Sequence, residues 1–180
     1  TRPVPNRRRF LRVRVYLPAT SEHLRGALAT GQFEEAGPAQ LTAFAVTAGL
    51  REWYVDDDIE ELEYAAALEA ARASLRMLST DPSAPRRRVV VAVDVAESAV
   101  TVRDDLDRGV VRVTGPIPLT AVASVHIDDK DAEAAVEAAA EAIGSADLGD
   151  THAQDLVDDA EGFELSWYAG QEIAALLDEL

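Results

Sequence analysis

The chain has 180 residues, 48% of them hydrophobic, which favours one globular domain with a substantial core over a disordered chain. It has no cysteine, so disulfides, cysteine nucleophiles and cysteine-ligated metals are excluded. The formal net charge is −16, and residues 128–180 hold 16 acids against one base, Lys130, so this surface repels nucleic-acid phosphates and anionic lipids.

The amino terminus has the opposite charge. Residues 1–10 (TRPVPNRRRF) contain four arginines and no acid, without apolar periodicity, and we expect a flexible basic arm. This arm lacks the apolar stretch and the small-residue cleavage site of a secretory signal. No apolar run in the chain reaches the about 18 residues that a membrane span needs. We therefore expect a cytoplasmic protein without membrane contact.

Periodicity and capping residues predict the elements in chain order. The first strand, Leu11–Leu17, alternates apolar and polar side chains and ends at Pro18. Thr20 or Ser21 can cap the helix that follows, and Gly31 can close it. The predicted strands are 11–17, 41–47, 88–95, 100–103, 109–114 and 122–127, and the predicted helices are 20–29, 58–79 and 131–143, the last closed by Gly144.

The strongest helix signal begins at Asp58, because Asp58 and Glu61 form a capping-box pattern. Apolar positions then step by four and three residues, which places them on one face of the helix. We expect this face to be buried; it comprises Tyr64, Leu68, Ala71, Leu75 and Leu78. The segment 151–180 is less regular, and there we expect a strand around Phe163–Trp167 and a last helix from Gln171.

The order of elements is strand–helix–strand–helix–strand, then hairpin strands, then a helix, a strand and a helix. Helical connections between the first three strands favour parallel pairing with right-handed crossovers. The hairpin strands would extend this sheet in antiparallel fashion. The sequence therefore predicts a single α/β domain over residues 11–180, with three layers and a mixed sheet that starts with a parallel βαβαβ unit.

Several segments resemble an uncharacterised domain family of actinobacteria. The resemblance covers nearly everything from Leu11 to the end, whereas members usually begin at the first strand and lack the preceding arm. It implies a bacterial cytoplasmic protein with one compact domain, and it supplies no reaction, cofactor or catalytic residue. The segments that carry it are RVYLPAT (14–20), AFAVT with LREWY (43–54), EELEYAA with AARASLR (60–76), RRRVVVAVDV (86–95), GPIPL (115–119), VHIDD (125–129) and DAEGFELSWYA (159–169).

Two tryptophan–tyrosine pairs are candidate ligand or interface residues. Trp53-Tyr54 and Trp167-Tyr168 hold the only tryptophans, and each pair lies near acidic residues. Large aromatic residues are common interface anchors, and one pocket lined by both pairs could hold a small ligand. The alternative interpretation is packing at the sheet edge, with the polar tips of these side chains in water.

A second candidate group is His126 with Asp128, at the end of a predicted strand and followed by Asp129 and Asp131. Imidazole and carboxylates together can bind a divalent metal or transfer protons. The alternative is that these acids cap the helix that follows. Thr20 begins a predicted helix, where free backbone N–H groups can bind an anion or the hydroxyl can simply cap the helix.

The remaining signals carry less chemistry. His152 lies near Asp155, Asp158 and Asp159, an acidic run that is also typical of a solvated helix face. The chain lacks GxGxxG, the P-loop motif, HExxH and GxSxG. The three arginines at 86–88 could contact phosphates, but the acidic remainder of the chain argues against nucleic-acid binding.

Taken together, these patterns favour a non-catalytic cytoplasmic interaction or small-ligand-binding domain that uses no cofactor or metal. Its protein partner would bind the acidic carboxyl-terminal third with Trp167 and Tyr168. The alternative is a small enzyme or metabolite sensor whose site lies at the carboxyl edge of the sheet, around Thr20, Trp53, His126 and Asp128. A third, weaker hypothesis is a nucleic-acid accessory protein that acts through the basic arm.

Overall fold

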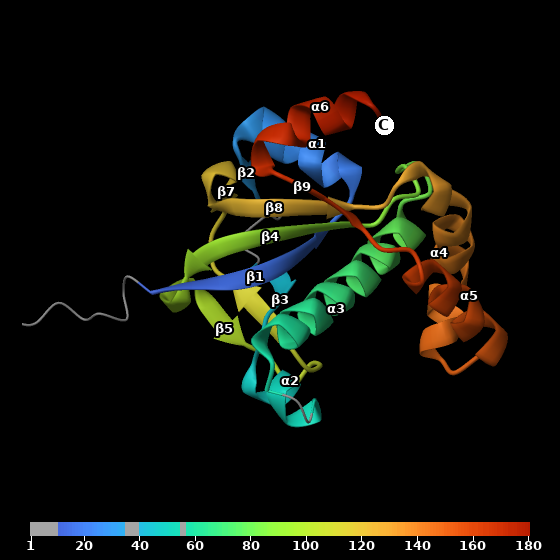
Figure 1. The fold of residues 1–180 in the computed structure, drawn as a ribbon, viewed down its shortest axis with the longest axis horizontal. Helices are drawn as coiled ribbons and strands as arrows, with labels where there is room; N and C mark the ends of the chain where they lie inside the picture. Colours follow the sequence, from blue (N-terminus) through green and yellow to red (C-terminus); the bar gives the residue numbers. More distant parts are fainter. Residues whose placement is uncertain (1–10, 35–39, 55–56) are drawn as a thin grey trace, which may run out of the picture.

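A seven-stranded sheet forms the centre of the computed structural model, which describes residues 11–34, 40–54 and 57–180 (Figure 1). The predicted basic arm, residues 1–10, lies outside these ranges. The strand order is β5-β6-β3-β1-β4-β8-β9, and β2 and β7 pair separately. The strands are β1 Arg12–Ala19, β2 Gln32–Phe33, β3 Leu41–Phe44, β4 Val89–Ala96, β5 Val100–Val102, β6 Val110–Val113, β7 Ile117–Pro118, β8 Val122–Ile127 and β9 Ser166–Tyr168.

Six α-helices are present in the described residues, and short 3₁₀ turns connect several strands. The helices are α1 Ser21–Thr30, α2 Ala48–Trp53, α3 Ile59–Thr80, α4 Glu133–Asp147, α5 Thr151–Glu161 and α6 Ile173–Asp178. The 3₁₀ turns are Glu97–Ala99, Leu119–Ala121, Lys130–Ala132 and Gly170–Glu172. Within this part of the chain, no helix combines the length and the apolar character that crossing a membrane requires.

The predicted parallel start of the sheet is wrong. Strand β1 pairs antiparallel with β3, through Tyr16 and Phe44, and antiparallel with β4 along its whole length. A helix between two strands permits a parallel crossover but does not require one. The long helix α3 does join two strands of the same direction, β3 and β4, but β1 lies between them. The chain is thus α/β with an antiparallel sheet, in place of the predicted mixed one.

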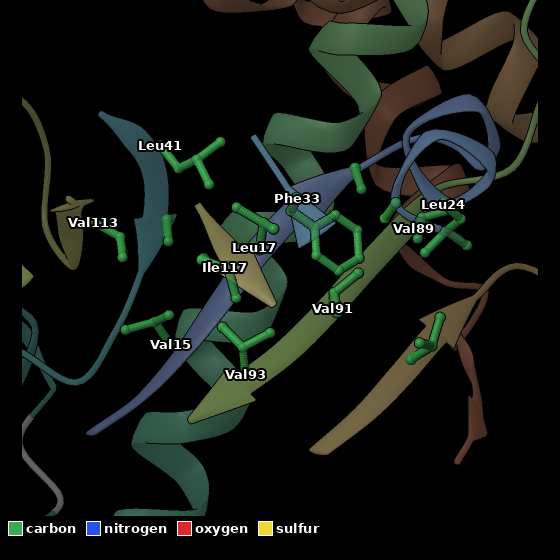
Figure 2. Packing of buried hydrophobic residues seen from close by; sticks show 14 of the residues in the cluster. Val15, Leu17, Leu24, Phe33, Leu41, Val89, Val91, Val93, Val113 and Ile117 are labelled. Carbon is green, nitrogen blue, oxygen red and sulfur yellow. The ribbon is translucent and has the colours of Figure 1, made fainter. Parts of the chain in front are cut away.

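One face of the sheet is closed. Because side chains alternate along a strand, Val15 and Leu17 of β1 point to the same side as Val89, Val91 and Val93 of β4. This apolar layer packs against Leu24 of α1, Phe33 of β2 and Ile117 of β7, as Figure 2 shows, and against Ile173, Leu176 and Leu177 of α6. All of these side chains are buried, so this face forms the main core.

The other face is covered by α3, which packs chiefly on β1, β3 and β4 (Figure 1). Asp58 caps this helix as predicted, by accepting a hydrogen bond from the Glu60 amide at 2.9 Å. The predicted apolar face is only partly correct, because Leu75 and Leu78 are buried while Tyr64 and Leu68 are exposed. Small residues let α3 approach the sheet closely and leave Tyr64 and Leu68 on its flank; these residues are Ala65, Ala66, Ala70 and Ala71.

Helices α4 and α5 form a hairpin that packs on the carboxyl end of α3, around Leu75 and Leu78. Helix α4 continues through Gly144, which was expected to end it. A glycine inside a helix costs about 1 kcal/mol relative to alanine, and the buried apolar side of α4 outweighs this cost. Helix α5 was not predicted, because its buried positions are Ala153, Val157 and Ala160, a weak apolar pattern in an acidic segment.

Most other predicted elements are confirmed with small shifts. Helix α1 ends at Gly31, whose left-handed φ of 83° closes it as expected. Strand β1 runs through Pro18 instead of ending there. The pairing of β1 with β3 involves only Tyr16, so β1 tolerates at Pro18 a residue that has no N–H to donate on the β3 side. Strand β9 and helix α6 confirm the strand–helix order expected for the last segment.

Candidate functional site

A groove of about 320 Å³ lies between α3 and the segment that leads into β9. We call it the α3–β8 groove. Its floor is formed by Tyr16, Val90 and His126, from three neighbouring strands, and one wall is the exposed flank of α3. The opposite wall is the segment 161–165, which leaves α5 and enters β9. All of the residues that line this groove belong to the described part of the chain.

His126 supplies the imidazole of the floor. It lies on β8 between Val90 of β4 and Trp167 of β9, with which it is in register. Its Nε2 atom is 2.9 Å from the Ser124 hydroxyl. Burial lowers the pKa of His126 below its usual value, and the nearby positive charge of Arg14 lowers it further. At neutral pH the ring is therefore uncharged.

Tyr16 lies beside His126 on the floor and is buried. Burial raises the pKa of its phenol, and the neighbouring carboxylate of Glu63 raises it further. The phenol therefore stays protonated at neutral pH. Among the described residues its hydroxyl has no hydrogen-bond partner, so it is available to a ligand in the groove.

The wall formed by α3 carries a stripe of side chains at helical spacing. Glu60, Tyr64 and Leu68 follow one another at four-residue steps, and Glu63 and Ala67 form a second, inner row. Tyr64 is 56% exposed and Leu68 is 39% exposed. This flank is thus acidic at its amino end and apolar further along.

The opposite wall is held by a buried ion pair. Arg88 donates to both carboxylate oxygens of Asp128 at 2.8 and 2.7 Å, and its backbone N–H donates to the same carboxylate at 2.8 Å. Both side chains are almost fully buried. Arg88 also donates a hydrogen bond to the backbone carbonyl of Phe163 at 2.9 Å. The ion pair therefore fixes the start of the segment that carries Phe163 and Leu165.

This arrangement places Asp128 away from the groove surface and gives it a structural partner. Asp129, next to it, accepts a hydrogen bond from the Ser166 hydroxyl at 2.7 Å. Neither carboxylate is hydrogen-bonded to the start of the helix that follows, so neither forms the expected cap. In the described ranges, no three His, Asp or Glu side chains gather as a metal-binding group, and this includes the residues around His126 and His152.

Thr20 begins α1 and is buried. Its backbone N–H donates to Nδ1 of His23 at 3.0 Å, and its hydroxyl lies 3.0 Å from the same atom. His23 thus closes the amino end of α1, which matches the capping interpretation of Thr20. Thr20 does not line the α3–β8 groove.

The two tryptophan–tyrosine pairs do not meet. Trp53 and Tyr54 follow β3, and three strands separate β3 from β9, a span of about 19 Å at the usual strand spacing. Trp53 stacks under the Arg108 guanidinium, 3.5 Å from the ring centroid. Trp167 is 62% exposed beside His126, whereas Tyr168 packs against the closed face. Only Trp167 therefore extends the surface of the groove.

The predicted carboxyl edge of the sheet is divided by the antiparallel pairing. Strands β1 and β8 both run opposite to β4, so Thr20 and Asp128 lie at the same end of the sheet. Strand β3 runs opposite to β1, which puts the segment leading to Trp53 at the other end. Of the residues proposed for that edge, His126 alone lines the groove.

Sequence reasoning missed most of the groove. Tyr64 and Leu68 were assigned to the core, and Tyr16 was counted only as a strand residue. A signal was present in the spacing. Leu62, Ala66 and Ala70 form a second row on the same helix, and this row together with the Glu60–Tyr64–Leu68 row is too wide for one buried helix face. Phe163 could be found only from the structure, since the contact that holds it comes from Arg88.

A larger cavity of about 410 Å³ lies between α1 and the strands β1 and β3, lined by Leu17, Phe33 and Met77 among others. The α3–β8 groove instead brings exposed apolar side chains together with His126, the phenol of Tyr16 and four glutamates, and it is the candidate site.

Comparison with known proteins places the chain in a family. Residues 13–177 match a family of unknown function (DUF6912). The chain belongs to that family. No curated protein and no solved structure matches it. The DUF6912 match spans every groove-lining residue and confirms that the resemblance seen in the sequence is to a family without an assigned function.

Proposed function

We propose that this DUF6912 domain is a non-catalytic binding domain and that its α3–β8 groove binds an apolar segment of a partner polypeptide. One observation carries the proposal: Tyr64, Leu68 and Phe163, all exposed, surround a groove whose floor is formed by two buried side chains and one half-buried side chain. Contiguous exposed apolar patches on a folded domain mark interaction sites, whereas scattered single residues do not.

The size and composition of the groove support a binding role. Its volume of about 320 Å³ falls within the range of ordinary ligand pockets. Aromatic side chains at the centre of an interface contribute much of its binding energy. Trp167 continues the apolar surface beyond the groove on the same side of the sheet as His126. A polypeptide segment, more than a compact metabolite, would contact both the groove and Trp167.

The partner surface differs from the one expected from charge alone. The sequence pointed to the acidic carboxyl-terminal third with Trp167 and Tyr168. The proposed surface keeps Trp167 and the segment 161–165, adds the flank of α3 and omits Tyr168. The surrounding acids argue against a nucleic-acid partner, since they repel phosphates.

Binding can be tested with a library of random heptapeptides displayed on phage and selected on the full chain. Tyr64→Ala/Leu68→Ala removes the apolar flank of the groove. The matched control is Ile59→Ala/Leu28→Ala, which truncates two residues of similar exposure outside the groove. We expect the first variant to weaken the enriched peptides by at least about tenfold, as for truncated interface anchors. Equal effects of the two variants, or no enrichment on the wild-type protein, would contradict the proposal.

A second candidate function rests on Ser124 and His126. With Nε2 of a neutral His126 2.9 Å from the Ser124 hydroxyl, the ring could take the hydroxyl proton while the oxygen attacks a carbonyl. No residue in the described part of the chain is hydrogen-bonded to Nδ1 to orient the ring, which favours the binding role. Labelling by a fluorophosphonate probe that Ser124→Ala abolishes would support an enzyme; absence of labelling would remove this candidate.

We propose further that residues 11–180 act as one domain in the cytoplasm of an actinobacterium. The support is compositional: Lys130 is the only lysine beside many arginines, alanines and aspartates, and cysteine is absent. Detection of the protein in the cytoplasmic fraction of its host would test the location.

A further inference from the structure

Resting on the proposed function, we infer that the α3–β8 groove selects a partner segment in which a lysine or arginine side chain neighbours an apolar residue. The cation would lie against Glu60, Glu63 and Tyr64, and the apolar residue between Leu68 and Phe163. The ligand class is therefore a basic, partly apolar peptide, and not an acidic or uncharged one.

Helical spacing places the three proposed cation contacts together. Glu63 and Tyr64 follow Glu60 by three and four residues, and side chains at these spacings are neighbours on a helix surface, with Cβ atoms about 5–6 Å apart. All three residues line the groove. Two carboxylates and one aromatic ring are thus neighbours at one end of the groove.

These carboxylates have no cation of their own. Within the described residues, Glu60, Glu63 and Glu164 form no ion pair, whereas Glu161 pairs with Arg72 at 3.2 Å. Like charges three or four residues apart on a helix destabilise it slightly. A bound ammonium or guanidinium group would relieve the repulsion between Glu60 and Glu63.

The positive groups near the groove are already paired. Arg88 is bound to Asp128, and Arg14 donates two hydrogen bonds to Asp94 at 3.0 and 2.9 Å. The floor histidine is neutral, so it does not offset the carboxylates either. Arg14 partly offsets the charge of Glu63, but the carboxylates of the groove keep a net negative charge that attracts an entering cation.

The aromatic ring adds a second attraction. Arg108 covers the ring of Trp53 in a cation–π contact elsewhere in the structure. Tyr64 is exposed, and in the described residues no arginine or lysine covers its ring. Stacking of a cation on an exposed aromatic ring contributes about 0.5–1 kcal/mol. Tyr64 is thus an exposed aromatic ring like Trp53, but within the described residues no cation covers it.

The acids of α3 have a competing explanation, because carboxylates in the first helical turn interact favourably with the helix dipole. Glu61 separates the two explanations. It lies in the same first turn and is exposed, but it does not line the groove. Glu61→Gln therefore removes the same kind of dipole interaction as Glu60→Gln and leaves the groove unchanged.

The test uses the phage-displayed heptapeptides selected on the wild-type protein, followed by fluorescence polarisation with the enriched peptides. We expect arginine or lysine beside leucine or an aromatic residue to be enriched, and aspartate and glutamate to be depleted. Glu60→Gln/Glu63→Gln should weaken binding about fivefold to tenfold, and Glu61→Gln should not change it. Binding should also weaken as salt rises from 50 to 300 mM.

The outcomes separate the two proposals. Enriched peptides that are uncharged, bind independently of Glu60 and Glu63, and are lost in Tyr64→Ala/Leu68→Ala would overturn the inferred cation specificity and support the binding groove. Enrichment that neither groove variant affects would overturn both. An equal loss in Glu61→Gln would show that the acids act through helix stability. Circular dichroism of each variant, recorded at the binding temperature, verifies that it is folded.

Discussion

The two faces of the sheet are built from the same strands but differ in how far other elements cover them. On the closed face, Val125 and Ile127 of β8 are buried in the core with the valines of β4. On the other face, the alternate residues Ser124 and His126 lie where the cover of α3 ends, and His126 lines the groove. Strand β8 thus has one wholly apolar side and one polar side. The difference shows that α1, α6 and the β2–β7 pair cover one face apart from the cavity beside α1, whereas α3 leaves the α3–β8 groove on the other face.

The largest expected effect comes from the ion pair that holds the groove wall. Arg88→Met leaves Asp128 buried without a counter-charge and removes the hydrogen bond to Phe163, so we expect a loss of about 3–5 kcal/mol in the free energy of unfolding. Chemical denaturation measures it. The control is Arg103→Met, which breaks an exposed ion pair with Asp105 and should change the free energy of unfolding far less, because water screens exposed pairs. Similar losses would mean that the wall does not depend on the buried pair.

The two sides of β8 can be compared directly. Ile127→Ala should cost about 2–5 kcal/mol, because it opens a cavity in the closed core. His126→Ala, one residue earlier, should cost less than half as much, since its side chain faces the groove and is partly exposed. Thermal unfolding of both variants measures the ratio. A larger loss for His126→Ala would show that both faces are core.

The pH dependence of the free energy of unfolding probes the sheet face that α3 covers only in part. Because burial and Arg14 hold the pKa of His126 below 6.5, the unfolded chain binds its proton more readily than the folded chain. The free energy of unfolding should therefore fall as pH drops through 6.5 towards the lower folded pKa. His126→Gln should reduce this slope, because it removes the group whose pKa differs between the folded and unfolded chains. An unchanged slope in His126→Gln would contradict burial of the ring.

The smallest effect concerns the two tryptophans, whose exposed fractions are nearly equal at 64% for Trp53 and 62% for Trp167. Single-tryptophan proteins made by Trp53→Phe or Trp167→Phe report on each separately. A groove-binding peptide should reduce acrylamide quenching of Trp167 and leave that of Trp53 unchanged. Protection of Trp53 alone from quenching would show that the peptide binds at the other end of the sheet.

Much of the secondary structure could be predicted from local patterns. The Val-Val-Val run of β4, the caps of α1 and α3 and the alternation of β8 are local signals, and the structure confirms these elements. Strand direction could not be predicted in the same way. A long helical connection fits either a parallel neighbour or a strand two places away, and only the insertion of β1 between β3 and β4 decides it.

The candidate site was predicted less well than the fold. His126 and Trp167 were singled out, and the structure places both on the same face of the sheet in register. Asp128 was also singled out, but its partner Arg88 lies 40 residues away in the sequence, and no local pattern reveals that contact. Tyr64 and Leu68 have the spacing of a core stripe; only the close approach of the alanines on α3 shows that they stay exposed.

The central claim is that the α3–β8 groove, extended by Trp167, binds a partner segment. Chemical-shift mapping of the ¹⁵N-labelled chain with an enriched basic–apolar heptapeptide tests it most directly. The account predicts perturbed amides along α3 from Glu60 to Leu68, at 163–165 and at the Trp167 indole, with little change in α1 and α6. Perturbations centred on α1 and α6, or none at saturating peptide, would contradict it.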